Sequence, residues 1–361
     1  MGSTNSRSSG GRSGSEGTTM RAAVYRRFGD ADVVEVDEVP VPVLRDDEVL
    51  IRVHAGTVSA GDYRARTRDV PRGVLLPAAL TVGFFRPRRP ILGMDVAGVV
   101  AAVGPDVTRF RVGDEVIAML GAAYGGHAEF AAIREGGAIA AKPRNLSFEE
   151  AVTLVFGGIT ARAFLAQSPL APGARVLVNG ASGAVGTAAV QLAKEAGAHV
   201  TAVCSAGSSG LVASLGADRV IDYRVTDFTQ EDQTYDVIVE CVGNAPFERV
   251  EGLISPGGAL LLVITDLLGV LRAPGRTRRS GKKIVTGPGR YRGEDLGFLV
   301  GLAEQRRFRP VIDRIYPLDD IVEAHRHVAG GHKKGNVVVR LTPAEDAAGA
   351  GEDHHTDHQT W

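Results

Sequence analysis

The segment from Arg175 to Gly197 carries the residues whose types and spacing predict chemistry. It reads as a short apolar strand, a turn with three glycines, and a run of good helix formers. Such a turn lets the backbone approach a pyrophosphate closely, while free N–H groups at the start of the helix face the phosphates. We therefore expect a dinucleotide here, and the alternative is a tight turn that binds nothing. The residues expected around the pyrophosphate are Ala181, Ser182, Gly183, Ala184, Val185 and Gly186.

The residues after this turn extend the prediction to the rest of a nucleotide-binding sheet. A second strand, from His199 to Cys204, ends about 20 residues after the glycines, where a Rossmann fold meets the adenosine ribose. Ser205 closes that strand at the place where an NAD enzyme usually has Asp or Glu, so nothing there repels a 2′-phosphate. We therefore predict NADPH as the cofactor, with NADH as the alternative. Further strands are expected at 219–221, 236–240 and 258–264, alternating with helices as a parallel sheet requires.

Length and composition bound the other possibilities. A chain of 361 residues with 44% hydrophobic residues is too long for one ordinary core and predicts two domains with a cleft between them. The net charge of -1 gives no general attraction to nucleic acids or acidic membranes. Two cysteines are too few for a disulfide framework or a multi-cysteine zinc site. The run from Gly258 to Leu271 contains Asp266 and is too short to span a bilayer, so we expect a soluble, cytoplasmic protein.

Outside the glycine-rich unit, the chain divides by composition. Residues 1–19 and the Ala/Gly/Asp/His-rich tail are predicted to be disordered, and the histidines of that tail are expected to be inert. Short, glycine-punctuated β patterns between Met20 and Lys142 predict a compact barrel-like domain, which the segment from 310 onward is expected to rejoin. One long helix between Leu146 and Ser168 is expected to join the domains. The segment Val70 to Pro90 is predicted to be a lid, with a membrane-surface element as the alternative.

Several motifs in a fixed order carry a family resemblance. They include ILGMDVAGVVAAVGPDVTRFRVGDEVIAM, GGHAEF, GGITARAFL, NGASGAVGTAAVQLAKEAGA, LGADRVIDYR and RPVIDRIYPLDDIVEAHRHV. From Met20 to Leu341 the chain resembles a medium-chain dehydrogenase/reductase of the zinc-independent quinone oxidoreductase-like branch. The resemblance implies an α/β fold: a GroES-like distorted β-barrel catalytic domain plus a Rossmann domain with a doubly wound parallel sheet. The implied boundaries are 20–147 with 310–343 for the catalytic domain, 148–309 for the cofactor domain, and 344–361 for the tail.

The resemblance also implies which residues form the site. Zinc-binding relatives hold their catalytic metal with Cys, a His-Glu pair and a later Cys or Asp, and the corresponding positions here look like Ser59, Met94 and Asp95. Serine and methionine do not suit zinc, so no metal is expected, and His54 and His127 are interpreted as structural. Ser59 and Tyr63 are expected to face the substrate, although a packing role for Tyr63 is the alternative. The implied cofactor contacts are Thr160 at the nicotinamide end, Val242 and Ile264 beside the ring and ribose, and Tyr223 with Arg224 at the 2′-phosphate.

Together these observations predict an enzyme. The first hypothesis is an NADPH-dependent, zinc-independent oxidoreductase that transfers hydride to a quinone or an α,β-unsaturated carbonyl. The alternatives are a zinc-free alcohol or ketone oxidoreductase, and a cofactor-binding protein without catalysis. The expected partners are a small-molecule substrate and a second copy of the chain, which would pair through the edge strand around Lys282 to Thr286, unless Asp266 to Arg279 shield that edge. No nucleic acid or membrane partner is expected.

Overall fold

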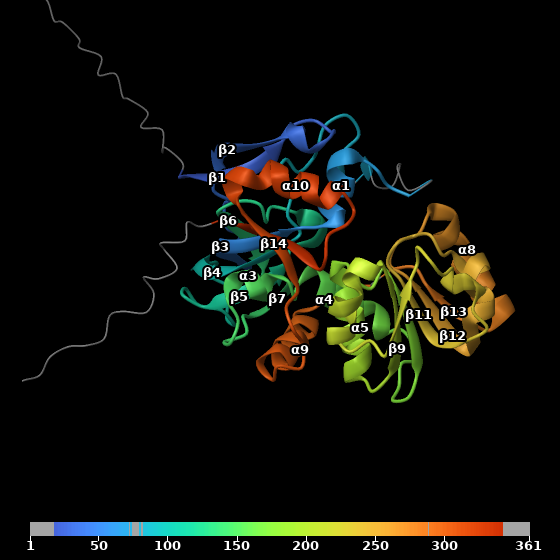
Figure 1. Cartoon of the computed structure of the whole chain (residues 1–361). Coiled ribbons are helices and arrows are strands. Elements are labelled where there is room, and N and C mark those ends of the chain that lie inside the picture. Colours follow the sequence, from blue (N-terminus) through green and yellow to red (C-terminus); the bar gives the residue numbers. More distant parts are fainter. Residues whose placement is uncertain (1–17, 72, 74–78, 81, 288, 342–361) are drawn as a thin grey trace, which may run out of the picture.

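A computed structural model describes residues 18–71, 73, 79–80, 82–287 and 289–341. Figure 1 shows two lobes: one holds both ends of the described chain, and the other is formed by the middle of the sequence. The predicted terminal disorder falls mainly outside the described residues, although Thr19 already belongs to the first strand. No helix among the described residues is long and apolar enough to cross a membrane.

The first lobe is built around a seven-stranded sheet whose strands come from both ends of the chain (Figure 1). Its path runs β14-β15-β3-β4-β5-β7, with β6 paired to β3. The C-terminal β15 pairs antiparallel with β3, so the last strand of the chain lies in the same sheet as the early strands. A separate ribbon of β1 and β2 packs beside this sheet. The strands are β1 (Thr19–Tyr25), β2 (Val34–Pro40), β3 (Glu48–Val58), β4 (Asp95–Val103), β5 (Glu115–Met119), β6 (Phe130–Arg134), β7 (Ala138–Ala141), β14 (Ile312–Pro317) and β15 (Asn336–Arg340), and the helices are α1 (Ala60–Thr67) and α10 (Ile321–Ala329).

The second lobe is a six-stranded sheet in which every neighbouring pair is parallel. Its strand order is β10-β9-β8-β11-β12-β13. Successive strands of the chain are therefore added outward on one side from β8 to β10 and on the other side from β11 to β13, as in a doubly wound nucleotide-binding sheet. The GroES-like sheet domain and the Rossmann-like domain predicted from the sequence are both present. The strands are β8 (Arg175–Asn179), β9 (His199–Cys204), β10 (Arg219–Asp222), β11 (Tyr235–Glu240), β12 (Ile254–Leu262) and β13 (Lys283–Val285), and the helices are α5 (Ala184–Glu195), α6 (Ser209–Ser214), α7 (Phe247–Val250), α8 (Leu267–Ser280) and α9 (Gly293–Glu304).

The connection between the lobes differs from the prediction. Instead of one long helix between Leu146 and Ser168, the structure has α3 (Phe148–Val152) and α4 (Phe156–Leu165). The break allows the N–H of Phe156 to donate to Oδ2 of the buried Asp95, 3.2 Å away. A continuous helix would use that N–H within its own backbone ladder. The prediction was therefore wrong because a tertiary hydrogen bond displaces a helical one.

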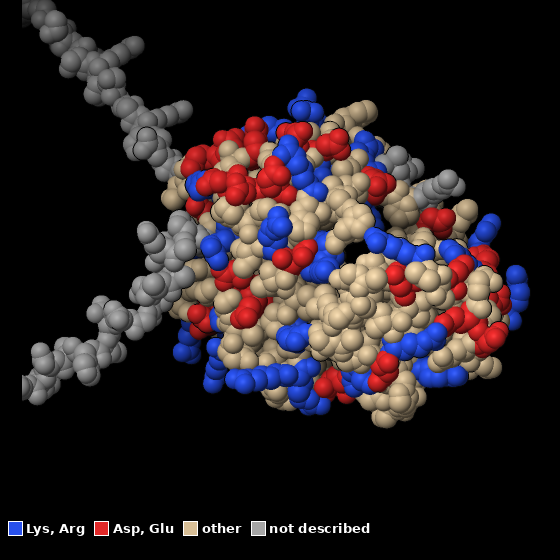
Figure 2. Space-filling model, viewed as in Figure 1, with Lys and Arg blue, Asp and Glu red and all other residues tan. Residues whose placement is uncertain are grey.

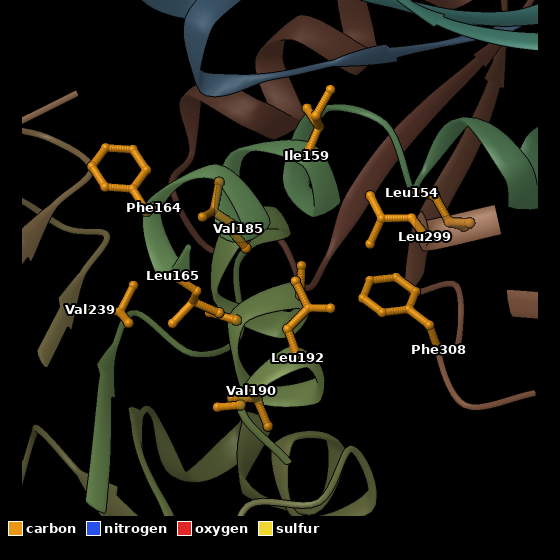
Figure 3. Packing of buried hydrophobic residues seen from close by; sticks show 14 of the residues in the cluster. Leu154, Ile159, Phe164, Leu165, Val185, Val190, Leu192, Val239, Leu299 and Phe308 are labelled. Carbon is orange, nitrogen blue, oxygen red and sulfur yellow. The ribbon is translucent and has the colours of Figure 1, made fainter. Parts of the chain in front are cut away.

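The interface between α4 and α5 forms the centre of the largest apolar core. Figure 3 shows Phe164 and Leu165 of α4 lying with Val185 and Leu192 of α5, and Leu299 of α9 lies on the other side. Glycine makes this approach possible, because a Cβ added to Gly157 of α4 would lie 2.4 Å from the carbonyl oxygen of Ala184. The start of α5 is thereby fixed against α4.

The predicted lid, Val70 to Pro90, lies partly outside the described residues. Of its described part, Val70 and Pro71 line a pocket, and Phe85 is 94% exposed. On the face drawn in Figure 2, basic and acidic side chains alternate, and acidic ones gather over the β1-β2 ribbon and α10. That face carries no broad basic patch.

Candidate active site

The glycine-rich turn between β8 and α5 forms a backbone cradle. Gly180 has a φ of +78°, a left-handed conformation that glycine adopts without strain. A Cβ added to Gly186 would lie 2.1 Å from the carbonyl oxygen of Gly180, so this glycine lets the helix pack on the turn. A Cβ added to Gly183, in contrast, would meet only that same oxygen, at 3.6 Å, so the space in front of Gly183 is open. Ala181, Ala184 and Val185 are buried beneath this opening, and Ser182 is half-buried. The chain therefore has the cradle that a pyrophosphate needs.

Val242 and Ile264 continue the site along the carboxyl ends of β11 and β12. A Cβ added to Gly180 would lie 2.8 Å from Cγ2 of Val242, and one added to Gly243 would lie 3.1 Å from Cγ2 of Ile264. The glycine turn, Val242 and Ile264 are therefore neighbours, although they are far apart in the sequence. This is the edge at which doubly wound sheets bind their ligands.

A pocket of about 430 Å³ opens between this edge and α1 of the other lobe. It brings three of the sequence-predicted residues together: Tyr63, Val242 and Ile264. Apolar and acidic side chains both contribute to its walls. The remaining lining residues are Arg64, Asp69, Val70, Pro71, Glu240, Gly243, Ala245, Pro246, Leu262, Thr265 and Asp266.

Among the described residues that line the pocket, only Tyr63 has a phenol group. Its hydroxyl donates a hydrogen bond to Oδ2 of Asp69, 3.2 Å away. Burial and this bond to Asp69 raise the pKa of the phenol above its usual value. Tyr63 therefore keeps its proton at neutral pH, with the hydroxyl hydrogen directed at Asp69.

Ser59 directly precedes α1, the helix that carries Tyr63, but its hydroxyl is engaged inside the protein. It is 4% exposed, accepts the N–H groups of Gly61 and Asp62, and donates to Oδ2 of Asp62 over 2.6 Å. The N–H of Ser59 also donates to this carboxylate, which completes a capping box at the start of α1. Ser59 is not among the pocket-lining residues, so its contacts give the expected substrate role no support and favour positioning of α1.

Thr160 also makes a contact that the sequence did not predict. Its Oγ1 lies 3.1 Å from the hydroxyl of Tyr291, and Thr160 is 4% exposed. Burial raises the pKa of the Tyr291 phenol. Tyr291 comes from the segment before α9, so the predicted nicotinamide-end threonine is oriented by a distant tyrosine.

Glu240 is a buried carboxylate that lines the pocket. Its Oε1 accepts the N–H groups of Val242 and Gly243, at 2.6 and 2.8 Å, and its Oε2 accepts the side-chain amide of Asn179 at 2.8 Å. Burial raises the pKa of this carboxyl, and these hydrogen bonds oppose the rise. Glu240 therefore fixes the turn that carries Val242. A charged residue closing an apolar parallel strand was the sequence signal for this role, and it was missed.

The positions that correspond to zinc ligands do not fit zinc. The Ser59 hydroxyl is occupied as described, Met94 offers a thioether, and Asp95 accepts from the N–H and hydroxyl of Thr57 and from the N–H of Phe156. Burial raises the pKa of Asp95 to about 7. Zinc sites in proteins favour thiolate and imidazole, and neither is present in this set. Within the described ranges, no three His, Cys, Asp or Glu residues are grouped closely enough to hold a metal ion.

His54 and His127, interpreted as structural, both pack within the barrel. The ring of His54 stacks on Phe148 with centroids 4.3 Å apart. Nε2 of His127 lies 2.9 Å from the carbonyl oxygen of Thr57.

The expected adenosine end lies after β9. Ser205 is half-buried, and the Tyr223 ring is 52% exposed with the Arg224 guanidinium 5.9 Å from its centroid. A second basic residue, Lys334, donates from Nζ to the carbonyl oxygen of Gly207 at 2.8 Å. Lys334 was also missed, because it is remote in sequence from the β9 strand.

Comparisons with known proteins agree with this architecture. The family model for the alcohol dehydrogenase GroES-like domain matches residues 45–144, and that for zinc-binding dehydrogenase matches residues 215–339. The chain is 32% identical over 338 residues to the chloroplast envelope quinone oxidoreductase homolog of Arabidopsis thaliana, covering 90% of this chain and 99% of the relative. It is 32% identical over 340 residues to the 2-methylene-furan-3-one reductase of Solanum lycopersicum, covering 90% of this chain and 80% of the relative. The solved quinone oxidoreductase from Coxiella burnetii superposes with a TM-score of 0.79 at 26% identity, covering 90% and 100% of the two chains.

Proposed function

The chain belongs to the medium-chain dehydrogenase/reductase superfamily as a quinone oxidoreductase-like member, and from this premise we propose that it reduces quinones or α,β-unsaturated carbonyls with NADPH and without zinc. It is an NAD(P)H-dependent oxidoreductase, as its quinone oxidoreductase and 2-methylene-furan-3-one reductase relatives indicate. The observation that carries the finer proposal is the pocket that joins Tyr63 to Val242 and Ile264 across the two lobes.

The chemistry follows from what this pocket offers. When bound, the reduced nicotinamide supplies a hydride. Without a metal to polarise a simple ketone, the site suits a substrate whose conjugation moves the developing negative charge to an oxygen remote from the attacked carbon. Tyr63 lies in the pocket, and turning its hydroxyl away from the exposed Asp69 lets it donate a proton to that oxygen.

The other residues position these groups. Glu240 holds the Val242 turn through two backbone N–H groups, so Val242 and Ile264 form a fixed apolar wall beside the ring. Thr160, held by Tyr291, orients the carboxamide end. The Ser59–Asp62 capping box holds the helix that carries Tyr63.

A steady-state assay tests the proposal directly. NADPH oxidation is measured with a panel of quinones and enones, alongside alcohols and simple ketones, before and after exhaustive chelation. We expect activity with the conjugated substrates that chelation leaves unchanged. Loss of activity on chelation would sink the zinc-free mechanism, activity with alcohols or ketones alone would favour the second enzyme hypothesis, and cofactor binding without turnover would favour the binding-only hypothesis.

A further inference from the structure

The segment His332–Gly335 leads into the last strand of the barrel and lies against the cofactor cradle. The N–H of Gly335 donates to the carbonyl oxygen of Ser182 at 2.7 Å, and Gly335 forms a parallel bridge with Gly183. A residue of the catalytic lobe is thereby joined to the turn expected to hold the pyrophosphate. The side chains just before Gly335 are therefore placed along the path of a bound dinucleotide.

Lys334 extends from this segment toward the adenosine end. Its Nζ donates to the carbonyl oxygen of Gly207, 2.8 Å away, and its own N–H donates to Oδ2 of Asp313 at 3.1 Å. Gly207 lies in the short turn Ala206–Ser208 that directly follows Ser205. No carboxylate in the described part of the chain forms an ion pair with the Lys334 ammonium, and one carbonyl satisfies only one of its three donors. A cation with free donors therefore lies beside the end of β9.

The turn itself offers no such charge. Ser205 has a hydroxyl, and the three residues after it are Ala206, Gly207 and Ser208. Gly207 has open space around its α carbon, since an added Cβ would meet no atom within 4 Å. The end of β9 thus combines room for a substituent on the ribose with a cation brought from a segment 127 residues away in sequence.

We propose that Lys334 is the specificity-determining residue for NADPH, through contact of its ammonium with the 2′-phosphate of the adenosine ribose. The inference rests on the proposed function, and it has the positive charge supplied from the other lobe and not from the turn after Ser205. A lysine acts on phosphate as a point charge, and a charged hydrogen bond of this kind adds strongly to affinity. The neighbouring Lys333 has a different task, because its Nζ donates to the carbonyl oxygen of Gly335 at 2.6 Å and supports the turn.

Calorimetric titration with 2′,5′-ADP and 5′-ADP tests Lys334 without turnover. The wild-type protein should bind 2′,5′-ADP more tightly. Lys334→Gln should weaken 2′,5′-ADP binding roughly tenfold or more while changing 5′-ADP binding by less than about twofold. Lys334→Arg should restore the preference, because it returns the charge. Lys283→Gln is the matched control. Lys283 is also exposed, but it lies in β13, which is the edge strand of the cofactor-lobe sheet far from β9. The affinities of this variant for 2′,5′-ADP and for 5′-ADP should both stay unchanged.

The outcomes separate the two proposals. If the wild-type protein binds both ligands equally, the preference for NADPH fails, and the role of Lys334 fails with it. If the wild-type protein prefers 2′,5′-ADP and Lys334→Gln keeps that preference, the role of Lys334 alone is overturned. Arg224→Gln then identifies whether the guanidinium beside Tyr223 carries the selection instead.

Discussion

The Ser59 hydroxyl donates to Oδ2 of Asp62 over 2.6 Å, and through this bond a residue expected in the substrate site becomes the first residue of a capping box. The other oxygen of Asp62 accepts the N–H of Gly93, so the same carboxylate ties α1 to the loop before β4. Tyr63 follows directly on this helix and reaches the pocket. Two residues assigned to substrate by the sequence thus have different tasks: one sets the helix, and the other faces the cavity.

Ser59→Ala should act through stability. Loss of an N-cap hydroxyl typically lowers the free energy of unfolding by about 1 kcal/mol, and the buried Asp62 loses a donor as well. Urea unfolding should show this loss, while kcat of the folded enzyme stays within about threefold of wild type. Ser59→Thr, which keeps the hydroxyl, is the control. A kcat reduced on the order of 100-fold at unchanged stability would return Ser59 to the substrate site.

Tyr63→Phe should show the opposite pattern. Loss of a hydrogen-bond donor at the charge that develops during reaction typically lowers turnover on the order of 100-fold. Stability should change little, because the lost bond is a 3.2 Å contact with an exposed aspartate, Asp69. Steady-state kinetics with a conjugated substrate and a urea melt give the two measurements. An unchanged kcat would assign Tyr63 to packing and leave proton delivery to water.

Gly183→Ala and Gly186→Ala form a matched pair in the cradle. A Cβ at position 183 would meet only one atom, at 3.6 Å, so the Gly183→Ala protein should fold normally but bind NADPH at least about tenfold more weakly, because the methyl group occupies the pyrophosphate approach. A Cβ at position 186 would lie 2.1 Å from the Gly180 oxygen, so Gly186→Ala should lower the free energy of unfolding by about 3 kcal/mol. Thermal unfolding and cofactor titration separate the two. Normal cofactor affinity in Gly183→Ala would mean that the cradle holds no pyrophosphate.

The sequence predicted the cofactor lobe more completely than the site between the lobes. The strand His199–Cys204 and the glycine turn follow local patterns, namely apolar runs and glycine spacing, and both were predicted correctly. The contacts of Lys334 with Gly207 and of Thr160 with Tyr291 join residues more than 100 positions apart, and no local pattern records such pairs. The broken helix before the cofactor lobe has the same origin, since its cause is the distant Asp95.

His325 should make stability depend on pH. It is fully buried, and burial, together with nearby His127 and Arg66, holds its pKa well below the usual 6.5. The unfolded chain takes up a proton at His325 near pH 6.5 while the folded protein does not. Protonation of His325 therefore leaves the free energy of unfolding unchanged above pH 6.5 and lowers it as the pH falls below 6.5. The wild-type protein should lose about 1 kcal/mol more per pH unit than His325→Leu in urea unfolding between about pH 6.5 and 5.5. Equal slopes in the two proteins would contradict the neutral state of His325.

A homodimer through the edge strand β13 remains a prediction. One side of β13 pairs with β12, and on the other side the N–H of Ile284 donates to Oγ1 of Thr277 in α8. That contact shields part of the edge, and Thr277 belongs to the segment from Asp266 to Arg279 that was the alternative to a partner strand. If the rest of the edge pairs across a twofold axis, sedimentation at micromolar concentration should give twice the chain mass of 37.9 kDa. A wild-type mass of 37.9 kDa would establish shielding by α8 instead.

The pairing of β15 with β3 sets an order of events during synthesis. β3 leaves the ribosome early, and β6 pairs with its first half, but the strand that pairs with residues 55–58 is made only after every strand of the cofactor lobe. The nascent barrel must therefore hold an unpaired edge while the intervening sheet, which is contiguous in sequence, is able to fold first. Truncation before Asn336 removes this last strand, so such a chain should retain a folded cofactor lobe and an open, aggregation-prone barrel.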